Sequence, residues 1–193
     1  MKDFILLFKN PREIFCKERE KTSVFGVFLL FLATYAVSFA VSMKQINNDA
    51  FGSLLKQIHL NAYVLVPIFL FFSWLTVVIA VSILSPIFRI CVRKIDSINI
   101  ENKKNFKSLI YLCYLIPSII TIIFDSIYTL ITNNAQQPPY LSPCTSIYTS
   151  LIFSIMLSYI LDHVYHGKKS RNIIPVVYFL ITTASTVIGL FSK

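Results

Sequence analysis

The sequence predicts an all-α integral membrane protein, a bundle of five transmembrane helices preceded by a short amphipathic helix at the membrane interface. Hydrophobic residues make up 55% of the 193 positions and charged residues only 14%, whereas a soluble domain carries about 25% charged residues. Residues 57–88 contain no Asp, Glu, Lys or Arg. A helix of about 20 apolar residues crosses the hydrocarbon core of a bilayer, so this stretch is long enough to span it.

Residues 1–21 are predicted to form a cytoplasmic amphipathic leader. Asn10, Pro11 and Glu13 make a helix-start signal, with a capping residue, a proline at the first helical position and an acid three residues after the cap. The residues that follow combine an apolar pair with several charges, which is typical of a helix lying along the membrane surface. The alternative is an ordinary solvated leader.

Residues 22–193 are predicted to form the membrane domain. Polar segments divide it into five apolar stretches, and each should be a helix because a chain in hydrocarbon must pair its own backbone amides. The expected spans cover residues 22–43, 61–85, 108–131, 145–161 and 173–191.

The basic residues predict the orientation of the chain. If the N-terminus is cytoplasmic, fifteen of the eighteen Lys and Arg lie in the leader and in the loops after the second and fourth spans. Lys and Arg concentrate on the cytoplasmic side of membrane proteins. We therefore expect the N-terminus in the cytoplasm and the C-terminus outside, and the short loops favour a bacterial cell inner membrane.

Packing between the spans should depend on small residues and on hydroxyl groups, which contact one another between membrane helices. Prolines at Pro67, Pro117 and Pro175 each remove one backbone hydrogen bond and can kink their helices. The small residues expected at helix contacts are Ala33, Ala36, Ser38, Ala40, Ala184, Ser185 and Gly189.

Asp125 is the one acid within a predicted span, and intramembrane carboxylates are candidates for function. It follows Lys107 by eighteen residues, which is about 27 Å along a helix. If Lys107 marks the inner surface, Asp125 lies near the outer one. There the carboxylate can be hydrated or can cap a neighbouring helix, so a functional and a structural role both stay open.

A second polar cluster, Asp162, His163 and His166, lies at the inner end of the fourth span. A histidine pair three residues apart shares one face of a helix and could bind a metal. The set lacks a fourth ligand, and the adjacent Lys168 and Lys169 would repel a cation. The favoured interpretation is a polar helix end, and we expect no metal site.

The basic segment after the second span predicts binding of anionic lipids, because a Lys or Arg near a membrane surface contributes about 1 kcal/mol of attraction. The alternative is that these residues only set the topology. The candidates are Arg89, Arg93, Lys94, Lys103 and Lys104.

Two segments carry a likeness to a known family: the leader LLFKNPREIFCKERE and the third span with its proline, YLCYLIPSII. Together with five spans and short basic loops, they resemble the short bacterial members of the Yip family, multi-pass proteins whose eukaryotic relatives interact with Rab-type GTPases. The Asp-Leu-Tyr-Gly-Pro type motif of those relatives is absent, which argues against GTPase binding and vesicle traffic. The resemblance implies a five-helix membrane domain and no catalytic residue.

The sequence predicts a protein that is not an enzyme. It contains no Walker-type or dinucleotide glycine loop and no GxSxG or HExxH motif, so we expect no cofactor. The favoured hypothesis is an inner-membrane protein that organises or binds partners, which are membrane lipids, other membrane proteins or a second copy, and not nucleic acid. The alternative is a small oligomeric transporter or channel that uses the kinked helices and Asp125. An intramembrane enzyme would rest on the Asp162 cluster alone.

Overall fold

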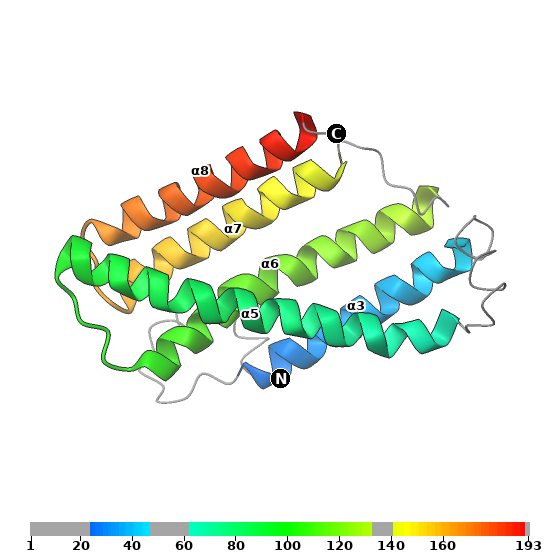
Figure 1. Cartoon of the computed structure of the whole chain (residues 1–193), viewed down its shortest axis with the longest axis horizontal. Coiled ribbons are helices and arrows are strands. Elements are labelled where there is room, and N and C mark those ends of the chain that lie inside the picture. Colours follow the sequence, from blue (N-terminus) through cyan, green and yellow to red (C-terminus); the bar gives the residue numbers. More distant parts are fainter. Residues whose placement is uncertain (1–23, 47–61, 133–140, 192–193) are drawn as a thin grey trace.

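The computed structural model describes residues 24–46, 62–132 and 141–191, and the predicted amphipathic leader lies outside them. Within these residues the chain forms helices and no strand (Figure 1). All five helices are long and apolar enough to cross a membrane, which confirms the predicted all-α five-helix membrane class. They are α3 (Phe25–Ile46), α5 (Ala62–Asp96), α6 (Lys103–Thr132), α7 (Leu141–His163) and α8 (Ser170–Phe191).

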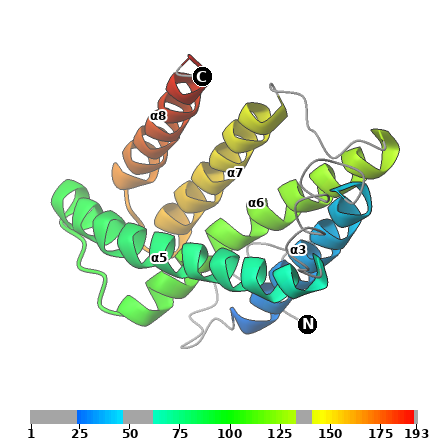
Figure 2. The same cartoon turned by 45° about the vertical axis from the view of Figure 1, so that its right-hand side comes forward.

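Helix α5 is much longer than the second predicted span. It has 35 residues and continues through Pro67 and Pro86 as far as Asp96, a length of about 52 Å against about 30 Å of hydrocarbon. Figure 2 shows that α5 crosses the other helices obliquely, and tilting is one way in which a long helix fits a bilayer. The first basic residues of the expected loop, among them Arg89 and Lys94, therefore lie on a helix, and only residues 97–102 connect it to α6.

Helix α6 lies at the centre of the bundle, between α3 and α7, while α5 crosses the bundle from α3 to α8, which packs on α7 (Figures 1 and 2). Its buried residues between Phe106 and Ile119 cover most of the circumference of the helix, and on the remaining side Tyr111, Tyr114 and Ser118 are partly buried. Asn102 begins α6, because its side-chain oxygen accepts a hydrogen bond from the N–H of Asn105 at 3.0 Å.

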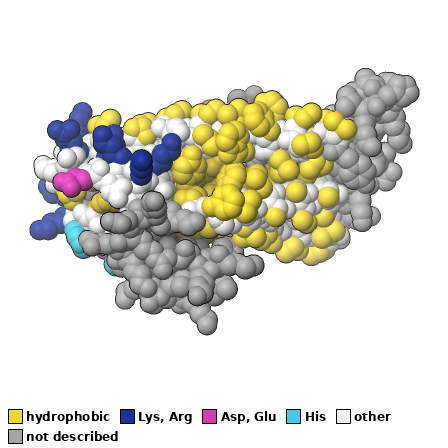
Figure 3. Space-filling model, turned by 90° about the horizontal axis from the view of Figure 1, so that it is seen from below, with side chains coloured by type: hydrophobic (Ala, Val, Ile, Leu, Met, Phe, Trp, Pro, Cys, Tyr) yellow, Lys and Arg dark blue, Asp and Glu magenta, His cyan; other side chains and the backbone are white. Residues whose placement is uncertain are grey.

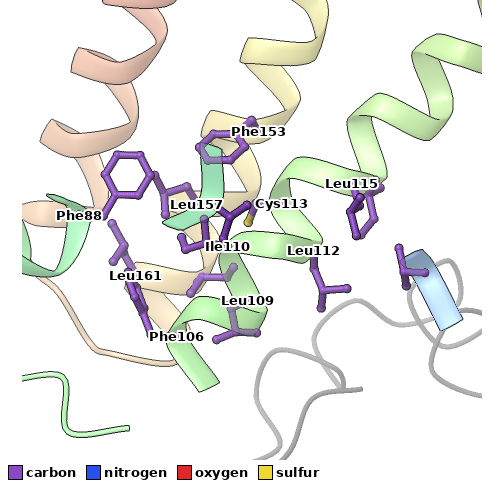
Figure 4. Packing of buried hydrophobic residues seen from close by; sticks show 14 of the residues in the cluster. Phe88, Phe106, Leu109, Ile110, Leu112, Cys113, Leu115, Phe153, Leu157 and Leu161 are labelled. Atoms are coloured by element: carbon purple, nitrogen blue, oxygen red, sulfur yellow. The ribbon is translucent and has the colours of Figure 1, made fainter. Parts of the chain in front are cut away.

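The core lies where α5, α6, α7 and α8 meet (Figure 4). Three aromatic side chains join helices that are distant in sequence: the ring of Phe153 lies 4.5 Å from that of Tyr178 and 6.1 Å from that of Phe88, between centroids. Cys113 and Leu157 are fully buried beside them. Aromatic pairs at these distances add stabilisation beyond the burial of their area.

Hydroxyl groups also join the helices, as predicted. The Oγ1 atoms of Thr121 in α6 and Thr149 in α7 lie 2.8 Å apart. Between α7 and α8, Ser146 Oγ lies 3.2 Å from Thr186 Oγ1. Such contacts stabilise membrane helices where no water competes for the hydroxyls.

The prediction for small residues in the fifth span is wrong. Ala184 and Ser185 are exposed, and a Cβ added at Gly189 would meet no atom within 4 Å. The buried residues of α8 lie instead near its start and are Ser170, Ile174 and Pro175, with Tyr178 packed against the core one turn farther on. Ala184, Ser185 and Gly189 therefore do not set the contacts of α8 within this chain.

Large apolar side chains cover the outside of the bundle. Phe72 is 57% exposed, Ile131 is 78% exposed and Phe191 is 88% exposed. A soluble monomer rarely exposes contiguous apolar surface of this kind, whereas lipid tails solvate it. The exterior is thus suited to hydrocarbon, and the protein is an integral membrane protein.

The central position of α6 predicts how two leucines on this helix differ. Leu115 is fully buried and Leu130 is 62% exposed. Because lipid is as apolar as leucine, the loss on truncation arises mainly from the cavity that is left. We expect Leu115→Ala to lower the free energy of unfolding by about 2 kcal/mol and Leu130→Ala by less than about 0.5 kcal/mol. Reversible unfolding in mild detergent measures both, and equal losses would contradict the central packing of α6.

Candidate functional site: the charged end

Between residues 62 and 191, all the ionisable Asp, Glu, Lys, Arg and His side chains that the structure describes, except Asp125, lie at one end of the bundle. Figure 3 shows this end with Lys and Arg beside acidic and histidine side chains, and apolar side chains along the rest of the face. We call it the charged end. It comprises Arg89, Arg93, Lys94, Asp96, Glu101, Lys103, Lys104, Lys107, Asp162, His163, His166, Lys168, Lys169 and Arg171.

The two loops of the charged end are joined by Asp96, the last residue of α5. Its carboxylate accepts hydrogen bonds from the backbone N–H of Lys169 at 3.0 Å and from that of Ser170 at 2.8 Å. The first amides of a helix have no partner within the helix, and an anion there also interacts well with the helix dipole. Asp96 therefore caps the N-terminus of α8 from a position 73 residues earlier.

The turn before α8 is tight enough to require glycine at Gly167. A Cβ at this position would lie 2.2 Å from Ser170 Oγ and 3.1 Å from Asp96 Oδ2. Just before it, His166 has a φ of 53°, and its N–H donates to the carbonyl of Asp162 at 3.1 Å. This left-handed residue ends α7 and turns the chain toward the carboxylate of Asp96.

The cluster predicted at Asp162 is held by an ion pair. Arg171 Nη1 donates to Asp162 Oδ1 at 2.5 Å, and His163 Nδ1 lies 3.6 Å from the other carboxylate oxygen. The ring of His163 stacks on Tyr159, with centroids 4.1 Å apart. The pair of Asp162 with Arg171 ties the end of α7 to the start of α8, whereas the contacts of His163 lie within α7.

The expectation that His163 and His166 share a helical face is wrong. Helix α7 ends at His163, and the left-handed backbone of His166 sends its side chain off the helix. Among the described residues, no group of three or more His, Cys, Asp or Glu is arranged to hold a metal.

Asp125 is separate from this cluster. It is partly buried on α6, near the opposite end from Lys107. The preceding residue, Phe124, lines an apolar hollow of about 520 Å³ between α6 and α7, together with Thr121 and Tyr148. Asp125 does not line this hollow. Its carboxylate is therefore near the hollow in sequence but is not part of its wall.

The five residues predicted to bind anionic lipid all lie at the charged end. Arg89 is half-buried, whereas the other four, Arg93, Lys94, Lys103 and Lys104, are exposed. Lys107, one turn farther along α6, donates to Ser82 Oγ on α5 at 3.2 Å. Lys107 therefore helps to join α5 and α6, while the exposed residues stay accessible to a partner.

An aromatic pair separates the charged end from the core. The ring of Tyr165 meets Phe106 edge-on, with centroids 5.4 Å apart. Burial raises the pKa of the Tyr165 hydroxyl to about 12, because a phenolate would lose its hydration there. The group is thus neutral at physiological pH and adds no charge to the site.

Two residues of this site, Asp96 and Arg171, were not singled out from the sequence. The sequence feature that could have pointed to Asp96 is its position as an acid within a basic segment. Its partner amides belong to a loop far along the chain, and no local spacing reveals that contact.

Comparisons with protein-family models, with curated proteins and with solved structures found no match. The resemblance to the Yip family therefore rests on the sequence segments alone. Of these, the leader lies outside the described residues, and the third span corresponds to α6 with Pro117 inside it.

The capping role of Asp96 predicts a local change in hydrogen exchange. We expect Asp96→Ala to speed exchange at the amides of Lys169 and Ser170 several-fold, because both would lose their acceptor. Glu101→Ala is the matched control, since Glu101 is an exposed acid in the neighbouring loop. Exchange followed by mass spectrometry over the α7–α8 turn measures the effect, and equal rates in both variants would refute the cap.

Proposed function

We propose that this protein is a non-enzymatic multi-pass membrane protein of the Yip-family type, which binds partners at the membrane through its charged end. The observation that carries the proposal is the distribution of charge. Nine Lys and Arg lie at this end with three acids, and two of those acids, Asp96 and Asp162, are engaged within the protein. The accessible charge is therefore strongly positive.

The first partner is an anionic membrane surface. Lys94, Lys103 and Lys104 are exposed at the charged end, where the apolar exterior of the bundle stops (Figure 3). Basic residues at this level attract the headgroups of the adjacent leaflet. Other membrane proteins with acidic loops, or a second copy meeting the exposed apolar helix faces, would be further partners. An N-terminus in the cytoplasm of a bacterial cell agrees with the positive-inside rule.

The contacts at the charged end support binding over catalysis. Asp96 caps a helix, Arg171 pairs with Asp162, and His163 stacks on Tyr159. These three contacts hold the ends of α5, α7 and α8 in place, which suits a binding surface.

A transporter or channel is the second candidate, favoured by the hollow of about 520 Å³ between α6 and α7 beside Phe124. Its lining is almost wholly apolar, and Asp125 is not part of that lining. Flux through reconstituted protein that Asp125→Asn abolishes and Glu101→Gln preserves would favour this candidate over the binding function.

The binding function predicts that the exposed lysines enrich anionic lipid around the protein. In nanodiscs of mixed phosphatidylcholine and phosphatidylglycerol, we expect replacement of Lys94, Lys103 and Lys104 by Gln to lower the enrichment of phosphatidylglycerol at the protein strongly. Each lysine contributes about 1 kcal/mol of attraction. The matched control replaces the same residues by Arg and keeps the charge. Mass spectrometry of the retained lipid measures the enrichment. Equal enrichment in both variants would show that these lysines do not bind anionic lipid and only set the topology.

A further inference from the structure

A groove of about 330 Å³ lies between α7 and α8, beside the turn that joins them. Its lining changes in character along its length. Ser158, Arg171 and Asn172 line it near the charged end, and Ile155, Val176 and Phe179 line it farther along. A groove that is polar at one end and apolar at the other suits an amphipathic ligand.

The register of the two helices sets the direction of the groove. Ser158 Oγ donates to the backbone carbonyl of Arg171 at 2.7 Å, so these two residues lie level with each other. Phe179 follows Arg171 by eight residues, about 12 Å along α8. Ile155 is 59% exposed and Val176 is 55% exposed, so the groove opens toward the lipid. It runs from the charged end into the hydrocarbon region.

A buried hydroxyl of this groove has no hydrogen-bond partner. Ser154 lines the groove and is 6% exposed, and its Oγ makes no hydrogen bond in the structure. Serines of α6 behave differently, since Ser118 and Ser126 donate to the carbonyl one turn earlier at 2.7 and 2.6 Å. A buried polar group without a partner is rare. Because the Oγ itself is buried, a ligand that accepts a hydrogen bond from Ser154 has to enter between α7 and α8.

Positive charge marks the polar end of the groove. The guanidinium of Arg171 carries five N–H donors, and its contact with Asp162 runs through Nη1 alone. The Arg171 side chain is 43% exposed, and Lys168 and Lys169 beside it are exposed. Three cations, Arg171, Lys168 and Lys169, stand here against two carboxylates, Asp162 on Arg171 and Asp96 on the amide of Lys169. The net charge at the mouth of the groove is therefore positive and suits a phosphate.

We propose that the groove binds one anionic phospholipid from the leaflet on the side of the charged end. Arg171 and Asn172 donate to its phosphate. Ser154, about 6 Å deeper than Ser158 along α7, donates to an ester carbonyl, and an acyl chain follows Val176 and Phe179. The site goes beyond the proposed function, because it uses neither Lys94 nor the lysines of α6 and holds one lipid rather than a general layer.

The test is native mass spectrometry of the full-length protein in detergent, titrated with dioleoyl phosphatidylglycerol, to obtain the dissociation constant of the first bound lipid. We expect Arg171→Gln to weaken it about tenfold and Ser154→Ala about fivefold, since each removes hydrogen bonds to the ligand. The matched controls are Lys104→Gln, which removes one charge from the other basic segment, and Ser118→Ala, whose hydroxyl is bonded within α6. Both controls should bind as the unaltered protein does.

A second pair of variants keeps the test decisive if Arg171→Gln disturbs the turn. Val176→Trp fills the groove from an exposed position and should abolish binding of the first lipid, whereas Ile181→Trp, at a 64% exposed position that does not line the groove, should not.

Equal losses of affinity for Arg171→Gln and Lys104→Gln would overturn the site in favour of diffuse electrostatic attraction. Equal affinity for dioleoyl phosphatidylcholine, or displacement of the lipid by equimolar inorganic phosphate, would also overturn it. The lysine variants of α5 and α6 test the proposed function separately.

Discussion

The hydrocarbon core of a bilayer offers neither hydrogen-bond partners nor solvation for charge, and the structure follows from that constraint. The backbone closes its own hydrogen bonds in five helices. Large apolar side chains such as Phe72 and Ile131 face outward, and the ionisable Asp, Glu, Lys, Arg and His side chains described between residues 62 and 191 gather at one end, apart from Asp125. Since lipid gives helices no hydrophobic reason to associate, packing around α6 and hydroxyl contacts such as Thr121 with Thr149 hold the bundle together.

At the charged end, charge serves two purposes. Asp96 and Asp162 fix the α7–α8 turn through the first amides of α8 and the guanidinium of Arg171. Lys94, Lys103 and Lys104 are exposed, and their side chains make no hydrogen bond or ion pair with the described residues. This division explains why a formally mixed cluster presents a basic surface. It also places the mouth of the α7–α8 groove on a turn that is held by Asp96 and by the pair of Asp162 with Arg171.

Hydropathy alone predicts the five helices, because length and composition decide whether a segment can cross hydrocarbon. It does not predict where they end: α5 runs on to Asp96, since charged residues are good helix formers once they leave the core. Contacts between distant segments could not be predicted from the sequence. The carboxylate that caps α8 belongs to Asp96, 73 residues before Lys169. Local rules also failed at His166, whose left-handed backbone ends α7, and at Ser185, which faces outward.

The most direct measurement of the central claim is the side of the membrane on which each helix end lies. Single cysteines at Lys104, Lys168 and Ser142, in a chain whose native cysteines are replaced, can be labelled with an impermeant thiol reagent in sealed vesicles of known orientation. Lys104 lies at the start of α6 and Lys168 in the turn between α7 and α8, both at the charged end, so both variants should react from one side and Ser142→Cys, at the start of α7, from the other. Labelling of Lys104→Cys and Lys168→Cys from opposite sides would contradict the arrangement of helices described here.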